Sequence, residues 1–151
     1  MDIPVQSLAT NGAFVAYAAS IVVLTLNLAV VWTMSAVVRG KSRTTPNEED
    51  AKAGRSRVEP QDPPEVARVL RAHANAMANI VPFAILGLVY VLAGGSAQVA
   101  LIVFGVFTAV RIAHSVAYLA GKQPWRTIFF VSGLVTTVVL TGFVVKALIP
   151  A

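Results

Sequence analysis

The sequence of 151 residues contains no cysteine, only two histidines and few charged residues. Without cysteine the chain has no disulfide bond, no thiolate nucleophile of its own and no cysteine-based metal site. Two histidines alone are also too few for a typical zinc site, so no metal is expected. Charged residues make up 13% of the chain against 56% apolar residues, and the mean hydropathy is +0.72. A soluble domain needs a more highly charged surface, so the composition predicts a membrane protein.

The apolar residues are gathered in four long blocks. Residues 14–38, 72–93 and 128–145 contain no Lys, Arg, Asp or Glu, and residues 97–119 are interrupted only by Arg111. A helix rises ~1.5 Å per residue, so blocks of this length can cross a hydrocarbon core of ~30 Å. Short glycine-containing turns near residues 94–96 and 121–124 place neighbouring helices antiparallel. The sequence therefore predicts an all-α, up-down, four-helix transmembrane bundle. The bundle is expected to form a single integral membrane domain over residues 1–151, with helices at about 14–38, 64–93, 97–119 and 125–148.

The basic residues indicate how the bundle is oriented. Residues 39–63 contain six Lys and Arg and residues 120–126 contain two, whereas residues 1–13 and 94–96 contain none. Basic loops of membrane proteins stay in the cytoplasm. The loops 39–63 and 120–126 are therefore predicted to be cytoplasmic, and both termini lumenal or periplasmic. The sequence pI is about 10.1, but the basic residues lie beside or inside apolar spans, so no nucleic-acid partner is expected.

Polar side chains inside the predicted spans form two stripes. At 100° per residue, Arg71 and Asn75 share one face of the second span, and Arg111, His114 and Tyr118 share one face of the third. Polar residues are costly within a membrane, so such stripes mark candidate sites.

The arginines near this end of the bundle lack acidic partners. Arg39 closes the first span and Arg126 opens the fourth, so both converge with Arg71 and Arg111 at the cytoplasmic half. Residues 66–151 contain six Lys and Arg but no Asp or Glu. A buried guanidinium needs a partner. The alternatives are acids of the 39–65 segment, backbone carbonyls, lipid phosphates or an anionic ligand. A further alternative for Arg39 is that its side chain extends to the lipid headgroups. Arg111 lies deeper in its span, so this alternative fits it poorly.

Two segments resemble a known protein family. Residues 71–83 read RAHANAMANIVPF and residues 111–119 read RIAHSVAYL. They resemble helix motifs of the membrane-associated proteins in eicosanoid and glutathione metabolism (MAPEG), closest to the microsomal prostaglandin E synthase-like members. Residues 47–51 and the Arg126-Thr127 pair also match, so the resemblance covers nearly the whole chain. It implies a homotrimer that binds glutathione between subunits near the cytoplasmic face and takes a lipophilic substrate from the membrane lipid.

The resemblance also implies roles for individual residues. Arg126 would stabilise the glutathione thiolate, with Thr127 beside it and Asp50 near the reacting centre. The cofactor-binding residues would be Arg39, Arg71, Asn75, His114 and Tyr118, and the polar stripe adds Arg111 to them.

Three positions depart from the family pattern. Ala78 stands where the family has the glutamate that holds the amino group of glutathione. Ala74 stands where the prostaglandin synthase-like members have an arginine, and Phe130 where they have a tyrosine. Two hypotheses follow. The chain is a glutathione-dependent transferase, peroxidase or isomerase acting on lipophilic electrophiles, or it is a non-catalytic trimeric membrane protein that binds an anionic lipid or a protein partner.

Overall fold

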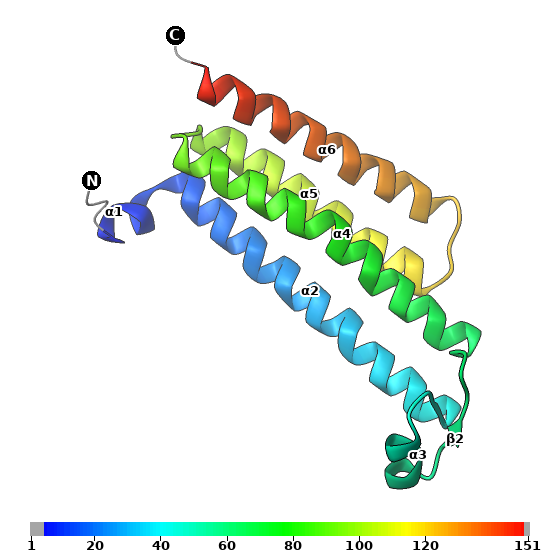
Figure 1. The fold of residues 1–151 in the computed structure, drawn as a ribbon. Helices are drawn as coiled ribbons and strands as arrows, with labels where there is room; N and C mark the ends of the chain where they lie inside the picture. The colour runs from blue at the N-terminus through cyan, green and yellow to red at the C-terminus, as the bar shows by residue number, and fades with distance from the viewer. Residues whose placement is uncertain (1–4, 150–151) are drawn as a thin grey trace.

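The computed structural model describes residues 5–149 and consists mainly of four long helices (Figure 1). These are α2 (Gly12–Ser42), α4 (Pro64–Leu92), α5 (Ala97–Leu119) and α6 (Trp125–Leu148). Each is long and apolar enough to span a membrane, which confirms the predicted transmembrane four-helix bundle. A short helix, α1 (Val5–Thr10), precedes them. The predicted location of the chain ends concerns residues 1–4 and 150–151, which lie outside the described residues.

Local sequence signals set where the helices begin and end. The side chain of Asn11 accepts hydrogen bonds from the backbone N–H groups of Ala13 and Phe14 and so caps α2. Pro64 occupies the first position of α4, where its missing N–H has no helical partner to lose. The α2 helix continues to Ser42, four residues beyond the expected end at residue 38, because no proline follows the apolar block until Pro46 and the helix tolerates Gly40.

The segment between α2 and α4 is folded rather than extended. It contains β1 (Thr44–Thr45), α3 (Glu48–Gly54) and β2 (Arg57–Val58), and the two strands pair in parallel. The end of α2 is tied to the residues before α4 by an ion pair between Arg39 Nη1 and Asp62 Oδ1 at 2.6 Å. The loop therefore sits as a compact unit at one end of the bundle (Figure 1).

Aromatic rings fill the centre of the bundle. The rings of Phe83 on α4 and Phe107 on α5 are stacked 3.5 Å apart, and Phe104 makes edge contacts with Tyr17, Phe83 and Tyr90. A Cβ at Gly87 would lie 3.0 Å from the Phe104 ring, so a larger residue here would require that ring to shift by a few tenths of an ångström. The Nδ2 of Asn27 donates to Ser115 Oγ at 3.1 Å, the interhelical bond expected of a polar residue within a span.

The α2 and α6 helices lie on opposite sides of α4 and α5 (Figure 1). Both pack against α4 and α5. Large apolar side chains cover the outside of the bundle, among them Leu101 at 67% and Val138 at 64% exposure. Such a surface is stable in contact with lipid.

Candidate functional site

A cavity of about 250 Å³ lies where α4, α5 and the first turns of α6 meet, and it brings together five of the predicted site residues. It is lined by Asn75, His114, Tyr118, Arg126, Thr127 and Phe130. The helical spacing explains the grouping, because His114 and Tyr118 are one turn apart on α5 and their rings are 5.7 Å apart. The first turn of α6 then presents Arg126 and Thr127 to the same space.

Hydrogen bonding fixes the orientation of His114. Its Nδ1 lies 3.0 Å from the backbone carbonyl oxygen of Arg126. A carbonyl only accepts, so Nδ1 carries the proton and donates. Among the described residues, the buried Nε2 has no hydrogen-bond partner. In the neutral ring this atom is an acceptor without charge.

Arg126 is held from two directions. Its guanidinium carbon lies 4.8 Å from the centre of the Tyr118 ring, a cation–π contact. The carboxamide of Gln123 satisfies both of its neighbours when its oxygen accepts from Arg126 Nη2 at 2.8 Å and its nitrogen donates to Thr127 Oγ1 at 3.2 Å. Gln123 therefore positions two lining residues. Sequence reasoning missed it because Gln123 lies in a turn, outside both stripes, and the only sequence signal was its distance of three and four residues from Arg126 and Thr127.

Arg111 lies behind the cavity rather than on its wall. Its side chain is completely buried, at 0% exposure, and its Nη2 donates to Asn75 Oδ1 at 2.9 Å. Its Nε and Nη1 have no hydrogen-bond partner among the described residues. Arg111 is thus connected to the cavity through Asn75, whose carboxamide oxygen accepts its hydrogen bond.

The remaining predicted site residues lie elsewhere in the chain. Arg39 and Asp50 line a separate cavity of about 230 Å³ beside the end of α2, together with Ala36, Gly40, Thr44, Thr45 and Ser56. Arg71 is exposed on α4 and lines neither cavity. The single chain therefore does not assemble all of the predicted residues in one place.

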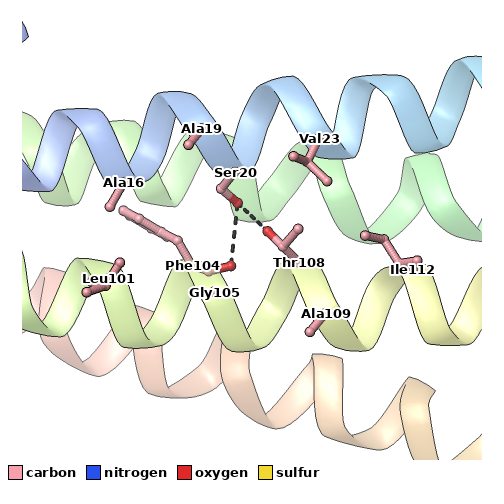
Figure 2. A pocket seen from close by; sticks show the side chains of 10 residues that line it. All are labelled: Ala16, Ala19, Ser20, Val23, Leu101, Phe104, Gly105, Thr108, Ala109 and Ile112. Carbon is pink, nitrogen blue, oxygen red and sulfur yellow. Dashed lines mark hydrogen bonds between the residues drawn. The ribbon is translucent and has the colours of Figure 1, made fainter.

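A larger apolar groove of about 380 Å³ runs between α2 and α5 (Figure 2). Its polar groups are Ser20 and Thr108, whose hydroxyl oxygens are 2.5 Å apart and hydrogen-bonded to each other. No charged side chain lines it. The groove therefore has the character of a lipid-facing surface and lacks groups that could activate a substrate. Within residues 5–149, no cluster of three or more His, Asp or Glu side chains is placed to hold a metal ion.

Comparison with known proteins decides the family. The model of the MAPEG family matches residues 14–146. The chain belongs to the MAPEG family. The resemblance seen in residues 71–83 and 111–119 is thereby confirmed.

Several curated proteins are similar to this MAPEG chain. Human prostaglandin E synthase is 37% identical over 108 residues, 71% of either chain. Bovine microsomal glutathione S-transferase 1 is 31% identical over 147 residues, which is 94% of this chain and 95% of the bovine protein. The rat microsomal glutathione S-transferase 1 is 47% identical over 70 residues, but this match spans only 45% of the rat protein. The chain is thus a multi-pass membrane protein of a family that includes glutathione transferases and prostaglandin E synthases.

Proposed function

We propose that this chain is a membrane-embedded, glutathione-dependent transferase, peroxidase or isomerase that acts on lipophilic electrophiles at the cytoplasmic side of the bilayer. The observation that carries the proposal is the cavity in which Arg126, held by Gln123 and Tyr118, faces the same space as Asn75, His114 and Thr127. The names of the MAPEG relatives add support, since they include glutathione S-transferases.

The proposed chemistry depends on a fixed positive charge. A thiol reacts as its thiolate, and a guanidinium close to the sulfur favours the ionised form. Arg126 is assigned this role and Thr127 a hydroxyl contact beside it. Asn75, His114 and Tyr118 would hold the polar parts of the tripeptide, with Arg111 acting from behind Asn75.

The direct test combines binding and turnover on the purified protein. Glutathione is expected to raise the melting temperature, because a ligand that binds only the native state stabilises it. Conjugation of glutathione to 1-chloro-2,4-dinitrobenzene in detergent micelles is expected to exceed the uncatalysed rate. An unchanged melting temperature together with no turnover of this or other lipophilic electrophiles would reject the proposal.

We further propose that the site is completed between subunits of a homotrimer. The division of the predicted residues supports this, because Arg39 and Asp50 belong to the α2 end while Arg126 belongs to α6 on the opposite side of the bundle (Figure 1). Arg39 and Asp50 of one protomer would then reach the α4–α6 cavity of the next, with Asp50 near the sulfur. Arg71, exposed on α4, would lie at the same boundary.

Co-expression of two inactive variants tests this arrangement. Arg39→Ala and Arg126→Leu are each expected to abolish most activity alone. In randomly mixed trimers, one site in about four combines an intact Arg39 with an intact Arg126 from its neighbour, so about a quarter of the activity should return. If the two residues served one site within a protomer, no mixed trimer would contain an intact site. Native mass spectrometry of the same samples would report whether trimers form.

The sidedness is proposed from the basic loops: residues 39–63 and 120–126 face the cytoplasm. The chain has no cysteine, so Lys52→Cys and Ser96→Cys each introduce one unique thiol. Both positions are exposed. A membrane-impermeant maleimide is expected to label residue 96 in intact cells and residue 52 only after permeabilisation. The opposite pattern would invert the topology.

A non-catalytic protein that binds an anionic lipid or a protein partner is the second candidate. It is favoured by Ala78, where the family glutamate is missing. Stabilisation by phosphatidylserine vesicles but not by any thiol would select it.

A further inference from the structure

We propose that the α4–α6 cavity recognises its thiol substrate through carboxylates alone, so that its substrates are small carboxylate-bearing thiols with or without an amino group. This inference rests on the proposed function and narrows it. Glutathione carries two carboxylates and one ammonium group, and the proposal is that the ammonium contributes nothing to binding.

The first ground is the charge of the cavity wall. Arg126 is positive, and the other lining residues, Asn75, His114, Tyr118, Thr127 and Phe130, carry no negative charge. No Asp or Glu occurs from residue 66 onward, so α5 and α6 contain none and α4 contains only Glu65 in its first turn. An ammonium group in this cavity would have no counter-charge from the helices that form it.

The second ground is the buried guanidinium behind the wall. Arg111 is completely buried and its Nε and Nη1 have no partner among the described residues, so its positive charge is not neutralised. Asn75 Oδ1 accepts the hydrogen bond from Arg111 Nη2, so the side-chain group of Asn75 that makes no hydrogen bond among the described residues is its NH₂, a donor that can bind a carboxylate oxygen. Apart from uncharged acceptors on His114, Tyr118 and Thr127, the wall offers hydrogen-bond donors backed by positive charge, which suits carboxylate oxygens and repels a cation.

The acids elsewhere in residues 5–149 do not change this. Asp62 is paired with Arg39 and Glu59 with Arg57, while the side chain of Asp50 accepts from Asn47 Nδ2 at 2.9 Å. Glu48, Glu49 and Glu65 are exposed, and none of them lines the cavity of the described chain. Asp50, the acid proposed to reach the site from a neighbour, is assigned to the sulfur, several bonds away from the ammonium of glutathione.

The decisive measurement compares three thiols on the purified full chain. These are glutathione, its deaminated analogue glutaryl-cysteinylglycine, and the glycine ethyl ester of glutathione. Dissociation constants come from titration calorimetry. The deaminated analogue is expected to bind at least as tightly as glutathione, and the ester about tenfold more weakly, since it loses one charge-assisted contact.

A matched pair of variants adds the missing charge. Ala78 is exposed on α4, one turn beyond Asn75, so a side chain there can extend without disturbing the core. Ala78→Glu is expected to reverse the preference, so that glutathione binds several-fold more tightly than the deaminated analogue. Ala78→Gln has the same size without the charge and is expected to keep the parent's preference.

The results distinguish a failure of this inference from a failure of the proposed function. If the parent binds glutathione tenfold more tightly than the deaminated analogue, the inference is overturned while the thiol-dependent function stands. If the ester binds as well as glutathione, recognition by carboxylates is likewise wrong. If none of the three thiols binds, the proposed function fails and the inference fails with it.

Discussion

Arg126→Leu is expected to lower kcat/KM for glutathione conjugation by about 10²-fold, roughly the loss seen when one transition-state electrostatic contact is removed. The guanidinium is held by Gln123 and stacked on Tyr118, so it is fixed before the ligand arrives. Under the proposed mechanism its charge acts most strongly as negative charge develops on the sulfur of glutathione. Binding of the neutral thiol, measured by thermal shift, should therefore change much less than turnover.

Two comparisons sharpen this prediction. Arg126→Lys retains the charge and should keep more activity than Arg126→Leu, although it loses the planar contacts to Gln123 and Tyr118. The deficit of Arg126→Leu should also narrow as the pH rises above about 8.5, where a free thiol ionises without assistance. A parallel loss of binding and turnover at every pH would instead mean that Arg126 only holds the ligand.

Asn75→Leu is expected to lower the free energy of unfolding by about 2–3 kcal/mol, because it removes the short-range acceptor of a buried charged group. Arg111 is completely buried, and its one short hydrogen bond runs from Nη2 to Asn75 Oδ1. Among the described residues, the guanidinium without that oxygen retains only the longer contact from Nη2 to the backbone carbonyl of Asn75, at 3.5 Å. Unfolding of the detergent-solubilised protein in sodium dodecyl sulfate would measure the loss.

The double variant provides the test of cause. Asn75→Leu combined with Arg111→Met removes both partners and should recover most of the lost stability, since no unpaired charge remains buried. Asn79→Leu is the matched control. The Nδ2 of Asn79 donates to the backbone carbonyl of Asn75 within the same helix, so its loss should lower the free energy of unfolding by about 1 kcal/mol or less. A double variant as unstable as Asn75→Leu alone would show that the loss does not arise from Arg111.

The spans and the grouping of the site could be predicted from the sequence for simple physical reasons. A block of 20 or more apolar residues has few stable structures other than a membrane helix. Helical periodicity placed His114 and Tyr118 on one face, and the structure puts their rings 5.7 Å apart. Periodicity gives the direction of a side chain but not its depth. It therefore grouped Arg111 with the ligand-binding residues, whereas the structure places Arg111 behind Asn75.

Contacts made by loops could not be predicted in the same way. The ion pair between Arg39 and Asp62 depends on how the folded segment after α2 returns to the bundle, which no local pattern specifies. The contact of Gln123 with Arg126 and Thr127 depends on the geometry of the turn before α6. Both contacts depend on the tertiary structure. Each involves residues of the predicted site, namely Arg39 in the ion pair and Arg126 and Thr127 in the contact with Gln123.

The four long helices differ in length, and this difference bears on how the proposed substrates would reach the α4–α6 cavity. The α2 and α4 helices contain 31 and 29 residues, against 23 and 24 for α5 and α6. At ~1.5 Å per residue α2 is about 46 Å long and exceeds a hydrocarbon core of ~30 Å, whereas α5, at about 34 Å, nearly matches it. The extra turns of α2 and α4 extend beyond α5 and α6 at the end that bears α3 (Figure 1). The α4–α6 cavity is lined by residues at the end of α5 and the start of α6, so a membrane matched to these two shorter helices would place it close to the boundary between water and lipid. Under the proposed function, a charged thiol would enter the cavity from the aqueous phase and an apolar electrophile laterally from the bilayer, so one site would join reactants from two phases.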